Sequence, residues 1–343
     1  MDKVIRRCPY RSSRIAEVIM ALDPQARAVL DQMAALGGPQ INELSPGEAR
    51  QQAIPMAAMQ GAAEPVATIE DRKLPGPAGA IPVRLYTPAG SGPQPVFVYL
   101  HGGGWVIGSL DDSDALCRTL CNAAQCIVMS VDYRLAPEHP FPAAVEDSYH
   151  AVLWASANAA SFGGDASRIA IGGDSAGGNL AAVVAQLARD RGQPALKCQI
   201  LIYPATDAAC DSPSYSQNSE GYFLTKEAMR WFWDHYVGRD VDRSNPLVSP
   251  LRAHSFKGLP PALVITAEYD PLRDEGEAYA ESLRNAGVPV QLTRYNGMIH
   301  GFFTMSAAMD QGRRAIEQAA ATLRLLQSRS HHSAVKPFLF PLR

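Results

Sequence analysis

The stretch Ile-Ala-Ile-Gly-Gly-Asp-Ser-Ala-Gly-Gly-Asn-Leu occupies residues 169–180 and joins an apolar β-like run to a helix-like run through a serine flanked by glycines. Residues 173–177 fit the pattern G-x-S-x-G, in which a nucleophilic serine lies on a sharp turn between a strand and a helix. Glycines suit such a turn because a Cβ on either side would clash with the neighbouring backbone. The pentapeptide alone is a weak indication, since chance would produce one in about a tenth of chains with this composition.

β-like runs recur on both sides of Ser175 and alternate with helix-like stretches. We expect strands at residues 96–100, 126–131, 169–172, 198–203, 262–269 and 290–295, and helices at residues 112–123, 143–157, 177–190, 272–286 and 307–327. All the strand candidates except the last are predominantly apolar, as expected for strands covered by helices on both faces. This alternation predicts an α/β fold with a mostly parallel, doubly wound sheet. Residues 66–88 predict an additional β-hairpin.

The composition narrows the class of protein. The 343-residue chain is 47% hydrophobic, and its 31 basic and 34 acidic residues leave a formal net charge of −3, which gives no indication of a nucleic-acid partner. Six cysteines scattered through a long chain favour a reducing compartment, so we expect a cytoplasmic protein. The chain contains no C-x-x-C pair, so its cysteines do not predict a metal site. No apolar run reaches the roughly 18 residues that a transmembrane helix needs.

A serine nucleophile needs a base that takes its proton and a third group that orients the base. In proteins with this kind of serine turn, an acid and then a histidine follow the serine along the chain. Among the later histidines, only His300 directly follows a predicted strand of the main sheet. Asp270 follows the strand at residues 262–269, and open α/β sheets place functional groups outside the carboxyl ends of their strands. Glu275 is the competing acid, although it should lie further away, within the next helix.

The sequence His101-Gly102-Gly103-Gly104, which we call the oxyanion loop, directly follows the expected strand at residues 96–100. Loops of this H-G-G-G type supply backbone N–H donors to the negative oxygen formed during acyl transfer. Composition alone would produce the tetrapeptide in about 0.4% of such chains. We predict that the N–H groups of Gly102, Gly103 and Ala176 are the donors. We expect His101 to anchor the loop by hydrogen bonds.

These motifs together resemble the hormone-sensitive-lipase-like esterases, the bacterial family IV carboxylesterases. The resemblance rests on residues 101–104, 132–138, 173–177, 270–275 and 300–301, and it covers about residues 65–327. It implies an α/β-hydrolase fold, a Ser175-Asp270-His300 triad, a helical cap and often a homodimer. Independently of the resemblance, the polar groups of residues 132–138 follow a predicted strand, and we expect them to brace the oxyanion loop by hydrogen bonds.

The expected organisation is a core with a cap inserted into it. Residues 20–60 contain two helices, one beginning at Asp23-Pro24 and one at the capping box Ser45-Pro46-Gly47-Glu48, and residues 205–250 contain a third, from Thr225 to Gly238. We expect these segments to form the cap, and residues 61–204 and 251–330 to form the catalytic core. Residues 1–19 form an unassigned extension, with Met20 as an alternative start, and residues 331–343 form a tail without an assigned role.

The expected function is that of a serine carboxylesterase, which hydrolyses small esters with short- to medium-chain acyl groups through an acyl-enzyme intermediate, without metal or cofactor. Trp105 and the aromatic cap helix suggest a closed apolar substrate pocket. Three alternatives stay open. A ligand receptor on this fold would typically lack a triad member, and a nucleotide-binding enzyme would need a G-x-G-x-x-G or a Gly-Lys pair, which this chain does not offer. An amidase or deacetylase would use the same residues, so only substrate profiling separates it.

Overall fold

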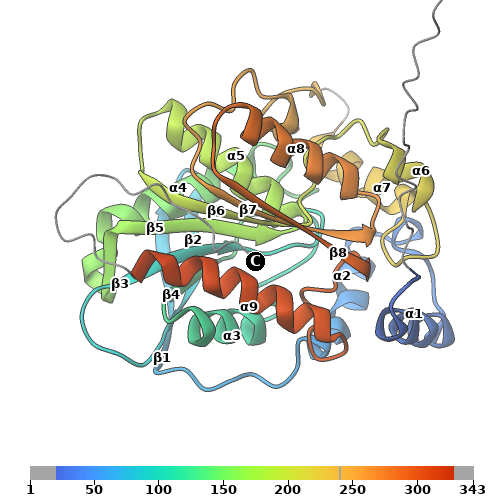
Figure 1. The fold of residues 1–343 in the computed structure, drawn as a ribbon, viewed down its shortest axis with the longest axis horizontal. Coiled ribbons are helices and arrows are strands. Elements are labelled where there is room, and N and C mark those ends of the chain that lie inside the picture. The colour runs from blue at the N-terminus through green and yellow to red at the C-terminus, as the bar shows by residue number, and fades with distance from the viewer. Residues whose placement is uncertain (1–20, 239–240, 328–343) are drawn as a thin grey trace, which may run out of the picture.

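An eight-stranded sheet runs through the part of the chain that the computed structural model describes, residues 21–238 and 241–327 (Figure 1). The strand order is β1-β2-β4-β3-β5-β6-β7-β8, with antiparallel pairing of β1 with β2 and of β2 with β4 and parallel pairing elsewhere. The strands are β1 (Thr68–Gly76), β2 (Gly79–Thr87), β3 (Gln94–Leu100), β4 (Ile127–Val131), β5 (Gly164–Asp174), β6 (Leu196–Ile202), β7 (Ala262–Tyr269) and β8 (Val290–Ile299). The predicted hairpin and mostly parallel sheet are therefore confirmed. Residues 1–19 and 331–343, for which we predicted an extension and a tail, lie outside the described ranges.

Helices cover both faces of the sheet. Figure 1 shows α3 (Asp114–Ala124) and α9 (Asp310–Arg324) on one side, and α4 (Ala143–Asn158), α5 (Ala176–Asp190) and α8 (Arg273–Asn285) on the other. Side chains of β3 alternate between the two resulting cores, with Val98 and Leu100 in one and Phe97 and Tyr99 in the other. This burial on both faces explains why the central strands are apolar throughout.

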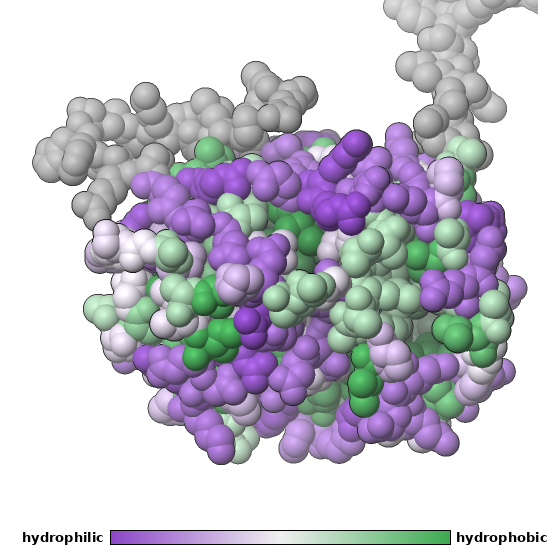
Figure 2. Space-filling view, turned by 90° about the horizontal axis from the view of Figure 1, so that it is seen from below, coloured by the Kyte–Doolittle hydropathy of each residue, from purple (hydrophilic) through white to green (hydrophobic). Residues whose placement is uncertain are grey.

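The outer surface of α9 shows why the helix sequences alternate in polarity. Arg313, Arg314 and Glu317 of α9 are exposed, whereas Ala315 and Ile316 are buried. Figure 2, seen from the side of α3 and α9, shows hydrophilic residues over most of this face with apolar residues between them. Among residues 21–238 and 241–327, no helix combines the length and apolar character that crossing a bilayer requires.

The remaining helices gather at the end of the sheet toward which its parallel strands point (Figure 1). They are α1 (Pro24–Leu36), α2 (Pro46–Ala53), α6 (Pro213–Gln217) and α7 (Lys226–Val237). Their starts follow the predicted caps, because Asp23 accepts from the N–H of Gln25, Ser45 and Glu48 form a capping box, and Thr225 accepts from the N–H of Ala228. Short 3₁₀ helices complete the described chain: η1 (Ile41–Glu43), η2 (Ile54–Gln60), η3 (Ala159–Phe162), η4 (Pro250–Arg252) and η5 (Leu325–Gln327).

The largest differences from the predicted element boundaries are at β5, β8 and α9. Strand β5 begins at Gly164, before the apolar run, and α9 begins at Asp310 because residues 300–308 form turns. Strand β8 continues to Ile299, although Asn296-Gly297 is a turn-like pair. It continues because Ile299 pairs with Tyr269 beyond an irregularity in the ladder, and because the N–H of Gly297 donates to the carboxylate of Glu268 at 2.7 Å. His300 therefore follows the strand directly.

Candidate active site

Ser175 lies at the corner between β5 and α5, with a backbone φ of 55° and ψ of −115°. Positive φ is costly for a residue with a side chain, and such strain is characteristic of functional turns. The turn fits because both flanking positions are glycine. A Cβ at position 173 would lie 2.1 Å from the carbonyl oxygen of Leu100, and one at position 177 would lie 1.9 Å from the same atom. The G-x-S-x-G pattern thus reflects the close approach of this corner to the end of β3.

The structure brings the three predicted triad residues together. Nε2 of His300 lies 3.0 Å from Oγ of Ser175, and Nδ1 of His300 lies 2.7 Å from Oδ2 of Asp270. The Asp270 side chain is fully buried, while Ser175 retains 9% and His300 6% of their exposed area. A histidine held between a hydroxyl and a buried carboxylate can take the hydroxyl proton and keep a single orientation while it does so.

Asp270, and not Glu275, is the acid that contacts His300. Asp270 directly follows β7, and its Oδ1 accepts from the N–H of Leu272 at 2.8 Å, which leaves Oδ2 for the histidine. Glu275 is buried within α8, where its Oε1 accepts from the N–H of Thr206 at 2.7 Å. Burial raises the pKa of Glu275 well above its ordinary value. Glu275 thus holds the segment after β6 and does not reach the histidine.

The prediction that Gly102 donates to an oxyanion is wrong in this structure. Its N–H donates to Oδ1 of Asp174 at 2.9 Å and so is already occupied. The N–H groups of Gly103 and Gly104 have no hydrogen-bond partner among the described residues, and neither does the N–H of Ala176 in the first turn of α5. Gly104 was missed because three consecutive glycines look alike in a sequence. The structure leaves Gly103, Gly104 and Ala176 as available donors.

Gly104 also fits closely against α7. It has a φ of 59°, and a Cβ built on it would lie 2.1 Å from the ring of Phe232. The left-handed backbone and the close ring each disfavour any other residue at this position.

Residues 132–138 brace the oxyanion loop, as predicted. The hydroxyl of Tyr133 donates to the carbonyl of His101 at 2.7 Å, and the two rings stack with their centroids 4.3 Å apart. The N–H of Ala136 donates to the carbonyl of Trp105 at 2.9 Å. His101 is held in this way at one end of the loop, which agrees with its expected role as an anchor.

Trp105 does not line a substrate pocket, contrary to the prediction. Its side chain is fully buried, stacked on Tyr236 at 4.3 Å between ring centroids and packed against Trp233 at 4.2 Å. The backbone at Trp105 has a φ of 61°, and the ring packs against α7. The aromatic stripe of α7 therefore holds the chain that follows the oxyanion loop.

A cavity of about 150 Å³ adjoins the oxyanion loop. Its wall includes Gly102 and Gly103 of the oxyanion loop and Asp174, which directly precedes Ser175 in the chain. The rest of the wall is mainly apolar and comes from η2, the region after the oxyanion loop and the turn after His300; it includes Ala53, Met56, Ala57, Ile107, Leu116 and Met305. An apolar group attached to a carbonyl at Ser175 could enter this space.

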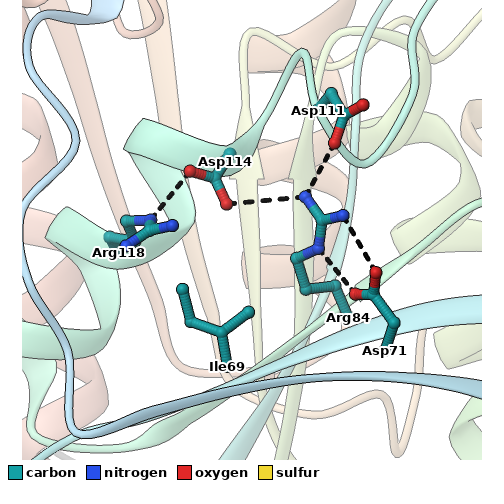
Figure 3. Close-up of a pocket in the computed structure, with 6 residues that line it drawn as sticks. All are labelled: Ile69, Asp71, Arg84, Asp111, Asp114 and Arg118. Carbon is teal, nitrogen blue, oxygen red and sulfur yellow. Dashed lines mark hydrogen bonds and ion pairs between the residues drawn. The ribbon is translucent and has the colours of Figure 1, made fainter.

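A second hollow, of about 500 Å³, lies away from the triad and is shown in Figure 3. Its charged groups are paired with one another. Arg84 forms ion pairs with Asp71 at 2.7 Å and Asp111 at 2.8 Å, and Arg118 pairs with Asp114 at 2.7 Å. These pairs connect β1, β2 and α3 and leave no free guanidinium for a ligand. Within the described ranges, no group of three or more His, Cys, Asp or Glu side chains is arranged to hold a metal ion.

Comparison with known proteins gives consistent matches. The model of a family with the alpha/beta hydrolase fold matches residues 97–304. Carboxylic ester hydrolase LipN of Mycobacterium tuberculosis is 51% identical over 69% of this chain, which spans 65% of LipN, slightly less than two thirds. Carboxylesterase NlhH of the same species is 46% identical, with 71% of this chain and 78% of NlhH aligned. An ester hydrolase from the metagenome of Lake Arreo superposes with a TM-score of 0.86 at 46% identity, covering 89% of this chain and 98% of that one.

Proposed function

The chain belongs to the hormone-sensitive-lipase-like carboxylesterases of the alpha/beta hydrolase family, and from this premise we propose that Ser175 is the nucleophile with which it hydrolyses short- to medium-chain carboxylic esters. The observation that carries the proposal is the contact sequence from Ser175 Oγ to His300 Nε2 at 3.0 Å and from His300 Nδ1 to Asp270 Oδ2 at 2.7 Å. The printed names of LipN and NlhH support an ester as the substrate class.

In the acylation step, Ser175 Oγ attacks the ester carbonyl while His300 Nε2 takes the hydroxyl proton. Asp270 holds the imidazole with Nδ1 protonated and stabilises the imidazolium that forms. The N–H groups of Gly103, Gly104 and Ala176 bind the oxyanion, and each such donor lowers the barrier by roughly 2.7–4 kcal/mol. The tetrahedral intermediate collapses when the alcohol leaves with the proton from His300, and the acyl group stays on Ser175.

In the deacylation step, His300 takes a proton from a water molecule, which attacks the acyl carbonyl. The second tetrahedral intermediate is bound by the same N–H groups, and Ser175 leaves with the proton that His300 returns. The carboxylic acid product then departs. Neither step uses a group other than the triad, the backbone donors and water.

The cavity beside the oxyanion loop supports a preference for small acyl groups. Its volume of about 150 Å³ is below the roughly 300–1,000 Å³ typical of sites for drug-sized ligands. We propose that the acyl chain enters it between Met56, Leu116 and Met305. With p-nitrophenyl esters, kcat/KM should peak at an acyl chain of about ten carbons or fewer. A peak at longer chains would contradict this assignment.

The decisive test is Ser175→Ala. The variant should fold with an unchanged Tm and lose at least about 1,000-fold in kcat on p-nitrophenyl butyrate, because oxyanion binding alone gives only weak catalysis. Ser167→Ala, on the exposed part of β5, is the matched control and should keep full activity. Retention of activity within tenfold in Ser175→Ala would refute the assignment. Comparing the rates of hydrolysis of butyranilide, an amide, and of the ester tests whether the protein is an amidase.

Three further features remain proposals. We propose that helices α1, α2, α6 and α7 form the cap, which their place at the carboxyl ends of the strands supports. A homodimer is testable by light scattering on the purified protein. A cytoplasmic location accords with the five cysteines among the described residues, all of which are buried and free.

A further inference from the structure

The side chain of Asp174 lies between the two segments that carry the oxyanion donors. Asp174 is the last residue of β5 and directly precedes Ser175. Its Oδ1 accepts from the N–H of Gly102 at 2.9 Å and from the hydroxyl of Tyr99 at 2.5 Å. The residue is 7% exposed, and it lines the cavity beside the oxyanion loop.

The bond from the Gly102 N–H to Asp174 connects two segments whose relative position matters for catalysis. Gly102 directly precedes Gly103 and Gly104, while Asp174 directly precedes Ser175 and Ala176. We propose that Asp174 is a positioning residue, which holds the N–H groups of the oxyanion loop at the correct distance from Ser175 and the N–H of Ala176. The inference rests on the proposed function and adds to it a residue that is not itself a donor, an acid or a base.

The contact also explains why position 102 is glycine although its N–H is not available to the substrate. A Cβ at position 102 would lie 2.3 Å from Oδ2 of Asp174. Any side chain there would push the carboxylate away and break the bond from the Gly102 N–H. The absence of a side chain at the first glycine of the loop therefore serves the connection to Asp174.

A general role in stability explains this arrangement less well. The fold holds the oxyanion loop independently at His101, through the hydroxyl of Tyr133, and beyond its end, through the N–H of Ala136. Burial of the Asp174 carboxyl costs free energy, and it raises the pKa of Asp174. Loss of its side chain should therefore leave the loop attached but its donors misaligned, and a misplacement near 1 Å can lower a rate about 100-fold.

Two substitutions at position 174 separate hydrogen bonding from charge. Asp174→Asn keeps an oxygen that can accept from Gly102 and Tyr99, so its kcat on p-nitrophenyl butyrate should stay within about fivefold of the wild type. Asp174→Ala removes the acceptor, and its kcat should fall at least about 20-fold with KM changed less than about threefold. Asp165→Ala is the matched control. It removes a carboxylate at the other end of β5, which also accepts from a backbone N–H, and it should leave kcat unchanged.

The inhibition constant of a trifluoromethyl ketone supplies a second measurement, which should not change if Asp174 only stabilises the fold. Its adduct with Ser175 carries a negative oxygen in the oxyanion site, so Ki should rise at least about 20-fold in Asp174→Ala and less than about fivefold in Asp174→Asn. If the alanine variant melts below the assay temperature, Asp174→Ser replaces it, because a serine hydroxyl is too short to reach Gly102.

The proposal is overturned if Asp174→Ala keeps kcat within threefold, or if Asp174→Asn loses as much as Asp174→Ala, since charge would then be the important property. Failure of the proposed function is recognised separately. In that case Ser175→Ala keeps its activity and a fluorophosphonate does not label wild-type Ser175, whatever the Asp174 variants do.

Discussion

The two carboxylate oxygens of Asp270 have different partners, and this division predicts the effect of a single atom exchange. Oδ1 accepts from the N–H of Leu272, and Oδ2 lies 2.7 Å from Nδ1 of His300. In Asp270→Asn, the amide oxygen keeps the bond from Leu272, but the amide NH₂ then faces His300. Since an NH₂ group cannot accept a proton, the histidine is stabilised with Nε2 protonated and cannot take the proton of Ser175.

We therefore expect Asp270→Asn to fold normally and to lose about 1,000- to 10,000-fold in kcat. Stopped-flow or long-time steady-state assays with p-nitrophenyl butyrate measure the loss, and thermal melting checks the fold. Glu275→Gln is the control variant. Glu275 is also a buried acid and is close to Asp270 in sequence, but it accepts a hydrogen bond from Thr206. A decrease below tenfold in Asp270→Asn would show that another acid orients His300.

The buried carboxyl of Asp174 leads to a second prediction at the residue scale, which concerns how the stability of the fold changes with pH. Burial raises the pKa of Asp174 above its ordinary value of 3.8. The folded state thus binds this proton more tightly than the unfolded state, so the resulting stability is fully present below about pH 3.8 and is lost as the pH rises through the raised pKa. The amide of Asp174→Asn cannot ionise, so this variant does not lose stability in this way as the pH rises. The Tm of the Asn variant minus that of the wild type should therefore increase as the pH rises from about 4.

Calorimetric melts in buffers of equal ionic strength measure this difference, because the other titrating groups are common to both proteins. A Tm difference that is constant across the pH range would mean that the buried carboxyl of Asp174 titrates normally.

At the scale of elements, Arg50 connects α2 to the segments that hold the oxyanion loop. Its guanidinium donates to the carbonyl of Val106 at 2.8 Å and the carbonyl of Ala136 at 2.9 Å, and it pairs with Glu138 at 2.6 Å. The hydrogen bonds from Arg50 lower the pKa of Glu138 to about 2. The stability from this pair is therefore present above about pH 4.5 and is lost as the pH falls toward 2.

Removal of Arg50 should cost more than removal of the charge of Glu138. The Glu138 side chain is 54% exposed, so Glu138→Gln should lower the free energy of unfolding by less than about 1 kcal/mol at pH 7. Arg50→Ala also removes the donor to two carbonyl groups and should cost about 1–3 kcal/mol. Urea denaturation of both variants measures the difference. Equal losses would show that the two backbone contacts of Arg50 contribute nothing.

Elements and motifs were predictable from sequence where the cause is local. The caps at Asp23, Ser45 and Thr225 and the apolar strands depend on neighbouring residues, and the structure has them where expected. The extension of β8 to Ile299 depends on Glu268 in another strand, which no local pattern reports. The N–H of Gly102 is occupied by its bond to Asp174, 72 residues away, and the ring of Trp105 packs against Tyr236 of α7, far along the chain. These long-range contacts decided the details of the site that the sequence left open.

At the scale of the whole molecule, segments far apart in the chain form the wall of the cavity beside the oxyanion loop. Strand β5 presents Asp174, η2 contributes Met56 and Gln60, and the turn after His300 contributes Met305. The N–H of Ala307 donates to the carbonyl of Met59 at 3.0 Å, which connects the N-terminal segment to the C-terminal one at this wall. Neither segment forms this wall alone, so an acyl preference set by the cavity, as proposed above, would be a property of the assembled fold.

Shortening the two methionines of this wall should lengthen the preferred acyl chain. Met56→Ala and Met305→Ala each remove a flexible apolar side chain from the cavity wall. Each added acyl CH₂ that becomes buried contributes about 0.8 kcal/mol, so two more buried groups should raise the ratio of kcat/KM for decanoate over butyrate esters about tenfold. Met33→Ala, on α1 and outside the cavity wall, is the control and should leave the ratio unchanged. If the cavity variants lower Tm without changing the ratio, the acyl chain does not occupy this space, and the preference must be set elsewhere around Ser175.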